Sequence, residues 1–523
     1  MIKLLALVAS KINLLRNEIL QIFSALQTGM SLEEQSQRVF GTVRAAFRSE
    51  KTLDIRFRKQ QLLALERFLR DESQMLLDAL HADLHKCTFE GDAAEIFLVQ
   101  AEIAYHLNNI DSWVAPKAAG DKGVAFAFDT CLLHPQPLGV ALIIGAWNYP
   151  IHLVLMPLVG AISAGCCAIL KPSEVSSRSA AALQALDNYL DSECYRVVNG
   201  AADVATALLQ QPFDHIFYTG GNEVGKIVME AAAKHLTPVT LEMGGKSPCV
   251  VDGNSDLDVV ARRILYGKFS NAGQICVSPD YVLCEKPVQS LLVDALQKAY
   301  KQFFKTDPKQ SSDYCRIINR RHFDRVRKLI DPAKVKIGGE VDESELYIAL
   351  TVMTDVGPDD PAMKEEIFGP VLPIVTVRDK EEAIEIINSR ENPLVIYVFS
   401  SDKSFVDKVQ RKTSSGTLIV NDTLSFILVP NLPFGGVGNS GTGRYHGYAT
   451  FTTFSNMRTV MKRSLALEFL NKARYPPYTI QNLAWMKWAM QLKRTGILRL
   501  FSFLVIFLAI ATIAILRFFG RLS

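Results

Sequence analysis

The sequence predicts an α/β protein built around a parallel, doubly wound sheet, and three observations support this. From residue 140 onward, short apolar runs alternate with helical patterns, and repeated strand–helix units of this length are typical of such sheets. Hydrophobic residues make up 49% of the chain and charged residues 21%, which is the composition of a folded protein. A length of 523 residues exceeds one ordinary core, so two or three domains are expected.

The chain begins with an extension, residues 1–30, whose role the sequence does not define. Its apolar patches are interrupted by charges, so they are too short to span a bilayer and form either an amphipathic helix or a segment before a second start at Met30. Ser31 is placed to cap a helix. From Ser31 to Asp111, apolar side chains recur every three or four residues, which predicts helices that pack a core.

The expected strands divide the rest of the chain into domains. Strands are predicted at 140–144, 167–170, 195–198, 215–219, 248–251 and 371–375, with β-rich stretches at 124–133 and 452–461. In parallel sheets, ligands bind beyond the carboxyl ends of the strands. We expect domains at 31–241 (including a β-rich stretch near 116–136) and 242–445, then a strand region at 446–470 and a linker at 471–496.

The C-terminus carries a long apolar run. Residues 500–516 contain no charge and are flanked by arginines and lysines, so that 497–517 reaches about the length that a bilayer requires. The alternative is a buried core helix. Because the run lies so close to the end of the chain, the sequence favours a transmembrane tail anchor with the remaining protein in the cytosol.

Charge and cysteine usage exclude several classes of function. The formal net charge of +3 gives no reason to expect a nucleic-acid partner. Nine cysteines are scattered without a Cys-x-x-Cys pair or zinc-type spacing, so we expect no metal site. Their odd number favours a reducing compartment.

The stretch 241–276 carries the residues best suited to catalysis. Glu242 precedes a glycine pair, and Cys276 follows a small, polar loop that contains glycine. A thiol can attack an electrophilic carbon, and a carboxylate can activate the water that later releases the adduct. Asn148, in a turn after the 140–144 strand, can donate to an oxyanion. Taken singly, Cys276 could equally be a small buried residue and Asn148 a structural one.

Two strand ends suggest a nucleotide site. The turn 220–225 joins a strand to a helix start, where free N–H groups can hold a pyrophosphate. Its spacing is not the usual dinucleotide fingerprint, so an ordinary turn is an equal interpretation. Lys171 and Glu174 follow another strand and could bind an adenosine ribose, with Glu174 repelling a 2′-phosphate. A solvated strand end is the alternative.

Together, these motifs resemble the aldehyde dehydrogenase superfamily. Seven matching pieces occur in that family's order: 147–150, 171–174, 219–225, 241–246, 273–276, 365–370 and 433–436. Further pieces resemble class 3, and its membrane-anchored fatty aldehyde members most closely: 231–240, 414–416, 445–447, 474–477 and the apolar tail. The chain departs from the pattern at Glu223, at Cys166–Cys167 and in its N-terminal extension.

The resemblance implies a Rossmann-type NAD-binding domain, a second α/β catalytic domain and a small β oligomerisation region. It implies that Cys276 attacks the aldehyde, that Asn148 and the Cys276 N–H stabilise the oxyanion, and that Glu242 activates the hydrolytic water. The implied NAD contacts are Lys171 and Glu174 on the adenosine ribose, Gly220, Gly221, Asn222, Glu223, Val224 and Gly225 at the pyrophosphate, Glu366 on the nicotinamide ribose and Phe368 near its ring.

A membrane tail and this resemblance together predict medium- to long-chain fatty aldehydes as substrates, because each buried methylene contributes about 0.8 kcal/mol to binding in an apolar tunnel. They also predict a homodimer on the endoplasmic reticulum membrane, with the peroxisome membrane as the alternative. Two rival functions remain: an acylating dehydrogenase that transfers its thioester to coenzyme A, and an inactive membrane-anchored scaffold. Glu242 argues against the first, and intact catalytic residues argue against the second.

Overall fold

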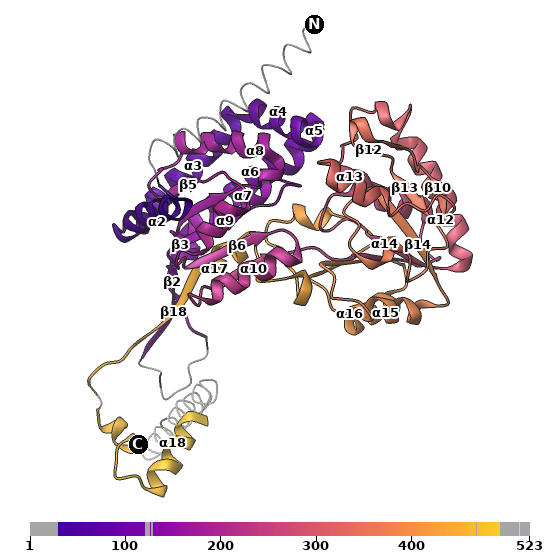
Figure 1. The fold of residues 1–523 in the computed structure, drawn as a ribbon. Coiled ribbons are helices and arrows are strands. Elements are labelled where there is room, and N and C mark those ends of the chain that lie inside the picture. Colours follow the sequence, from indigo (N-terminus) through magenta and orange to yellow (C-terminus); the bar gives the residue numbers. More distant parts are fainter. Residues whose placement is uncertain (1–29, 121–125, 127–128, 467, 492–511, 513–523) are drawn as a thin grey trace, which may run out of the picture. The chain divides into compact units, whose positions relative to one another are not determined.

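The computed structural model describes residues 30–120, 126, 129–466, 468–491 and 512, and it divides into two compact units (Figure 1). The first unit comprises residues 1–111 and 137–455, and the second comprises residues 112–136 and 456–523. The extension 1–29 lies outside the described residues. All the site residues predicted from the sequence belong to the first unit.

The N-terminal part of the first unit is helical, as expected. Ser31 caps the first described helix, because its hydroxyl accepts from the Glu34 N–H (3.2 Å) and the Glu34 carboxylate accepts from the Ser31 N–H (2.7 Å). The helices are α2 (Leu32–Arg48), α3 (Ile55–Asp71), α4 (Ser73–Leu84), α5 (Thr88–Gly91) and α6 (Phe97–Val114), with a π-helical segment at Asp92–Ile96 between the last two.

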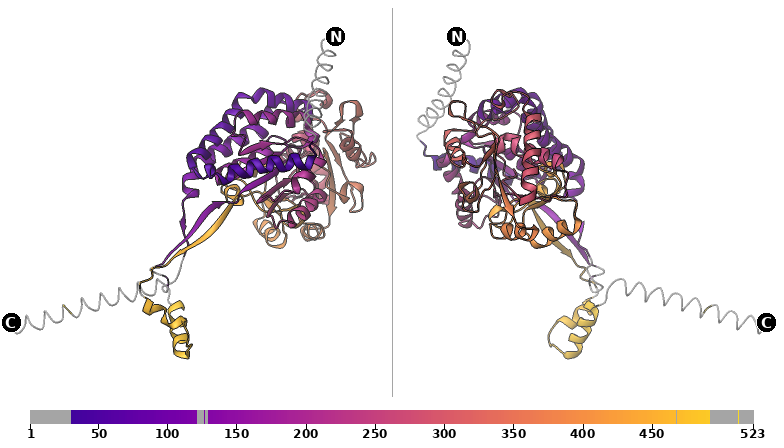
Figure 2. Two further views of the ribbon diagram at one scale, coloured as in Figure 1. Left: turned by 60° about the vertical axis from the view of Figure 1, so that its left-hand side comes forward. Right: turned by 90° about the vertical axis from the view of Figure 1, so that its right-hand side faces the viewer.

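A six-stranded sheet forms the core of this region, and helices lie on both its faces (Figures 1 and 2). Its order is β17 (Gly441–Thr442), β7 (Val239–Glu242), β6 (His215–Thr219), β3 (Val140–Ile144), β4 (Cys167–Lys171) and β5 (Tyr195–Val197), all parallel except β17. The connecting helices are α7 (His152–Ala164), α8 (Ser177–Leu183), α9 (Ala202–Leu209) and α10 (Asn222–Ala233). This confirms the predicted parallel α/β fold.

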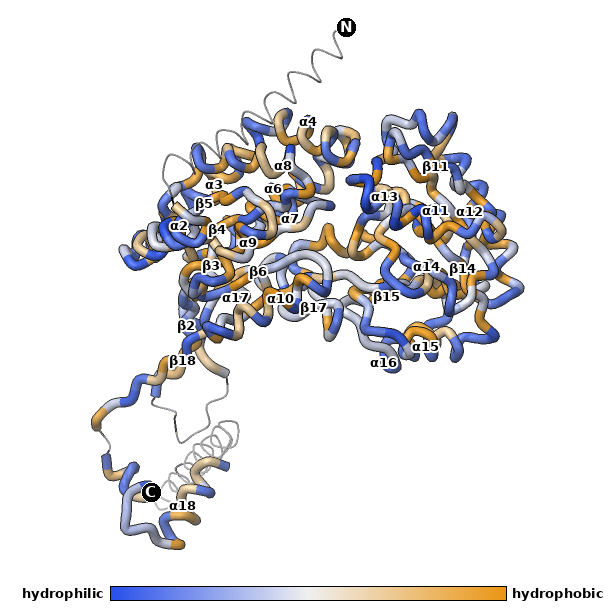
Figure 3. The backbone as a smooth tube through the Cα atoms, viewed as in Figure 1, coloured by the Kyte–Doolittle hydropathy of each residue, from blue (hydrophilic) through white to orange (hydrophobic). Residues whose placement is uncertain are grey.

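A second sheet of seven strands follows. Its order is β10 (Val335–Ile337), β13 (Thr351–Met353), β14 (Val371–Val377), β9 (Tyr281–Glu285), β8 (Pro248–Val251), β15 (Val395–Phe399) and β16 (Thr417–Val420), parallel except for β10. Its helices are α11 (Leu257–Phe269), α12 (Lys286–Phe303), α13 (Arg320–Arg327), α14 (Pro361–Lys364), α15 (Lys380–Asn388) and α16 (Lys403–Lys412). A hairpin of β11 (Val341–Asp342) and β12 (Tyr347–Ile348) lies apart from this sheet. Hydrophobic stretches run through both large sheets (Figure 3).

The second unit contains a three-stranded sheet in the order β1 (Lys117–Ala118), β2 (Thr130–Pro137) and β18 (Ser455–Lys462), and helix α18 (Ile480–Gln491). The strand predicted at 452–461 was wrong at its start. Helix α17 (Tyr448–Thr453) occupies that position, because it packs against α7 and buries Thr450 and Phe451. Among the described residues, no helix is both long and apolar enough to cross a bilayer. Apart from Thr512, the predicted anchor 497–517 lies outside those residues.

Candidate active site

The parallel strands of the six-stranded sheet bring most of the predicted site residues to one edge. Ile144, at the end of β3, is paired with Lys171 on one side and with Tyr218 on the other. Thr219, at the end of β6, is paired with Glu242. Consequently the turn after β3, the Lys171 motif, the turn after β6 and Glu242 all lie at the carboxyl edge, where ligands of such sheets bind.

The loop that carries Cys276 turns sharply. Asn271 and Ala272 have positive φ angles of 49° each, and Gly273 has a φ of +70°. A Cβ atom at Gly273 would lie 2.3 Å from the carbonyl oxygen of Gly369, so glycine is required there for both conformation and space. Three successive left-handed residues are costly, and such strain is typical of functional loops.

Hydrogen bonds lock this loop to Asn148. The Asn148 side chain donates to the Gln274 carbonyl (3.0 Å), and the Asn271 side chain donates to the Asn148 carbonyl (3.0 Å). The Gln274 side chain donates to the carbonyls of Asn271 and Arg316 (3.0 Å each). Because an asparagine amide has two N–H groups, this bond leaves one of them for a further acceptor. Sequence reasoning singled out Asn148 but assigned no role to Asn271 or Gln274.

The electrostatics at Cys276 and Glu242 oppose ionisation. Burial, together with the negative charges of Glu366 and Glu242, raises the pKa of the Cys276 thiol above its usual range, although the N–H groups of Cys276 and Val277 favour the thiolate. Glu242 is 3% exposed, and within the described chain neither of its oxygens has a hydrogen-bond partner. Burial therefore holds its pKa well above the usual range. A buried, unpartnered carboxyl group is costly for a fold and typical of a catalytic site.

The nucleotide contacts predicted at 171–174 and 220–225 lie on the same edge as Glu242. Lys171 is buried and donates to Glu174 (2.7 Å), whose side chain stays 44% exposed and so can accept from a ligand. Gly221 precedes α10, and a Cβ atom there would have nothing within 4 Å, so the approach to the helix N–H groups is open. Glu223, where the chain departs from the family pattern, forms an exposed ion pair with Lys226.

Glu366 and Phe368 come from the second sheet's side of the site. The Glu366 carboxyl lies against Gly244, where a Cβ atom would come 2.2 Å from Oε2. Burial, followed by the charge of Asp280, raises the pKa of Glu366 to about 8. Phe368 has a φ of 45°, and its ring centroid lies 5.3 Å from that of Trp147 in the turn after β3. The contact between Phe368 and Trp147 thus joins the seven-stranded sheet's region to the turn after β3 of the six-stranded sheet.

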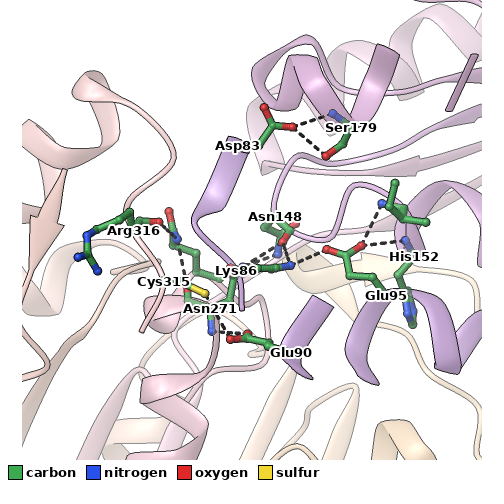
Figure 4. Close-up of polar contacts among 12 residues, drawn as sticks. Asp83, Lys86, Glu90, Glu95, Asn148, His152, Ser179, Asn271, Cys315 and Arg316 are labelled. Atoms are coloured by element: carbon green, nitrogen blue, oxygen red, sulfur yellow. Dashed lines mark hydrogen bonds and ion pairs between the residues drawn. The ribbon is translucent and has the colours of Figure 1, made fainter. Parts of the chain in front are cut away.

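A buried polar network forms hydrogen bonds with the turn that carries Asn148 (Figure 4). Lys86 and Glu95 are fully buried and form an ion pair at 2.5 Å. Lys86 also donates to the Asn148 carbonyl (2.9 Å), and Glu95 accepts from the N–H groups of Ile151 (3.0 Å) and His152 (3.1 Å). The pair therefore holds both ends of the turn that carries Asn148.

The same segment also holds the Cys276 loop. Glu90 accepts from the Asn271 N–H (2.6 Å) and from the Cys315 thiol (3.3 Å), as Figure 4 shows. The roles of Lys86 and Glu90 could not be predicted from the sequence, because residues 31–111 show an ordinary amphipathic helical pattern in which Lys86 falls between two helices. Charged residues there are normally solvent-exposed, and the pattern gives no sign of their burial.

The chain is similar to known proteins over most of its length. A model of the aldehyde dehydrogenase family matches residues 26–460. The chain is 48% identical to aldehyde dehydrogenase family 3 member A2 of Pongo abelii, over 91% of this chain and 98% of that protein. It is 51% identical to the dimeric NADP-preferring aldehyde dehydrogenase of Rattus norvegicus, over 83% and 96%. A substrate-bound structure of Staphylococcus aureus AldH superimposes with a TM-score of 0.84 at 39% identity, over 86% and 98%. The class 3 resemblance is thereby confirmed.

Proposed function

We propose that this chain, which belongs to the aldehyde dehydrogenase family, oxidises medium- to long-chain fatty aldehydes to carboxylic acids through a cysteine thioester. The chain is an aldehyde dehydrogenase that uses NAD. We propose in addition the fatty substrate, the roles of individual residues, the dimer and the membrane location. The mechanism rests on one observation. Glu242 is buried without a hydrogen-bond partner in the described chain, and the loop before Cys276 accepts a hydrogen bond from the Asn148 side chain.

The residues at the sheet edge fit NAD. Glu174 would accept from the adenosine ribose and Lys171 would hold Glu174 in place, while the N–H groups at the start of α10 would bind the pyrophosphate. Glu366 would accept from the nicotinamide ribose, with Phe368 close to the nicotinamide ring. When bound, NAD supplies the hydride acceptor for oxidation of the aldehyde carbon.

Cys276 carries the covalent chemistry. Its sulfur bonds to the aldehyde carbon, and the thiol proton passes to a base as the carbonyl oxygen becomes an oxyanion. Asn148 and the Cys276 N–H donate to that oxygen, and the bonds from Asn148 to Gln274 keep the amide in place. Loss of hydride from this adduct leaves a thioester on Cys276.

Glu242 completes the reaction. Its carboxylate takes a proton from water as the water oxygen attacks the thioester carbon, and the carbon–sulfur bond then breaks to give the acid and the thiol. A carboxyl with a raised pKa is the stronger base once it is ionised, which suits this step. The same base argues against the acylating alternative, since coenzyme A brings its own thiol and needs no activated water.

The fatty substrate and the location rest on the tail at 497–517. A protein anchored in a bilayer meets aldehydes that partition there, and long acyl chains gain about 0.8 kcal/mol for each methylene buried. We therefore propose the endoplasmic reticulum membrane, with the catalytic unit in the cytosol and the peroxisome as the alternative. Truncation after residue 491 and fractionation of cells that express either form test this. A truncated protein that stays on membranes would contradict it.

We further propose a homodimer. The Rattus norvegicus relative is named dimeric. Among the described residues of this chain, β18 is an outer strand of the three-stranded sheet, and a second copy could pair with its outer edge. Light scattering of the truncated protein should give twice the mass of the monomer. A monomeric mass at micromolar concentration would refute the dimer.

The experiment that tests the activity measures NADH formation from hexadecanal and from acetaldehyde, with the intact protein and Cys276→Ser. We expect turnover without coenzyme A, a higher kcat/KM for hexadecanal, and loss of turnover in the variant. Turnover that requires coenzyme A would favour the acylating rival. No turnover from a folded protein that binds NAD would favour the inactive scaffold.

A further inference from the structure

Arg444 lies beside the proposed general base. Strand β17 pairs antiparallel with β7 and sets Gly441 opposite Glu242, and Arg444 follows β17 in a half-buried position. Its guanidinium donates to the carbonyl of Gly416 (2.9 Å) and to that of Gly435. One arginine side chain thus fixes two backbone segments close to Glu242.

Gly435 shows how close the two side chains are. A Cβ atom built there would lie 2.9 Å from Cδ of Arg444 and 3.1 Å from Oε1 of Glu242. The stem of the arginine and the carboxyl of the base therefore flank the same glycine. A side chain at position 435 would separate or displace them.

Within the described chain, Glu242 interacts electrostatically with Arg444, Cys276 and Tyr445. Burial raises the pKa of both Cys276 and Tyr445 above their usual ranges, so these two are neutral at pH 7. Burial also raises the pKa of Glu242, and the positive charge of Arg444 opposes that effect. Within this group Arg444 is therefore the one charge that favours the carboxylate.

We propose that Arg444 is a positioning residue for thioester hydrolysis: it holds the Gly416 and Gly435 segments beside Glu242, and its positive charge favours the carboxylate form that takes a proton from water. The inference rests on the proposed function and adds a residue to it. The step that Arg444 supports is hydrolysis of the thioester on Cys276. Glu242 accepts the water proton, the water oxygen bonds to the thioester carbon, and the proton ends on the departing sulfur of Cys276.

The test separates charge from hydrogen bonding with two variants of the full chain. Arg444→Lys keeps the positive charge, whereas Arg444→Gln keeps a donor and loses the charge. Arg390→Gln is the matched control, because Arg390 is also half-buried and donates to a backbone carbonyl, that of Met363, but is not among the groups that interact with Glu242. Reaction with p-nitrophenyl acetate acylates Cys276 without cofactor. The burst of p-nitrophenolate then measures acylation, and the later steady rate measures hydrolysis.

We expect the pH midpoint below which hydrolysis slows to move to higher pH by up to about one unit in Arg444→Gln, because loss of a nearby positive charge raises the pKa of a carboxyl group. Arg444→Lys and Arg390→Gln should keep the wild-type midpoint, and every variant should keep the burst. If Arg444→Gln does not fold, Arg444→Met provides the neutral comparison.

An unchanged pH midpoint of hydrolysis in Arg444→Gln would overturn the proposal. Equal losses of the hydrolysis rate at every pH in Arg444→Lys and Arg444→Gln would also overturn it, because they would indicate that hydrogen bonding acts without the charge. Failure of the proposed function looks different. In that case the wild type would show the ester burst but would form no NADH from any aldehyde.

Discussion

The fully buried pair of Lys86 and Glu95 allows a sharp prediction for Glu95→Gln. Glutamine has nearly the same shape, but it has one oxygen in place of two and no charge. That oxygen can accept from Lys86, or from the N–H groups of Ile151 and His152, but the amide NH2 must then face the remaining donors. The Lys86 ammonium is left in the interior without its partner charge. Such a change lowers the free energy of unfolding by about 3–5 kcal/mol.

The second variant is Lys86→Met combined with Glu95→Gln, which removes both charges. It should regain most of the lost stability, because a neutral buried pair often matches an ion pair. Denaturant unfolding followed by circular dichroism measures both proteins. The double variant still lacks the bond from Lys86 to the Asn148 carbonyl, so its kcat should fall about fivefold to tenfold, the cost of one hydrogen bond that positions the oxyanion donor. A loss below about 1 kcal/mol in Glu95→Gln alone, or a double variant less stable than the single one, would refute the argument.

Three further predictions concern the site itself. Asn148→Ala should lower kcat by about 10²–10³-fold with little change in KM, the usual effect of removing an oxyanion donor, and steady-state kinetics will measure it. Binding of NAD should tighten as pH rises through about 8, because the ionised Glu366 carboxylate accepts hydrogen bonds from ribose hydroxyls. Titration calorimetry should show this pH dependence in the wild type and not in Glu366→Gln. Gly273→Ala should lower stability by more than 1 kcal/mol and abolish the ester burst, since its Cβ would meet the Gly369 carbonyl at 2.3 Å; a fully active variant would show that the loop can relax.

Much of the fold could be predicted because its signals are local. The run at 140–144 is continuously apolar and that at 215–219 has an apolar and aromatic centre, and both are fully buried central strands. Ser31 was identified as a cap from one residue and its neighbours, and the capping box is present. The strand predicted at 452–461 is confirmed from Ser455 onward as β18 but fails at 452–454, because threonines and a phenylalanine that favour strands end a helix where α7 offers a packing surface. The domain boundaries and the roles of the site residues stay predictions.

The sequence by itself determined the nucleophile, the base and the oxyanion donor as candidates, since Cys276, Glu242 and Asn148 lie in motifs that are read along the chain. Only the tertiary structure decided what surrounds them. Arg444 lies 202 positions after Glu242, and Lys86 lies 62 positions before Asn148, so no local pattern links either pair. Burial and charge depend on the distance between atoms in space, and that distance is fixed when the two sheets and their helical layer pack together.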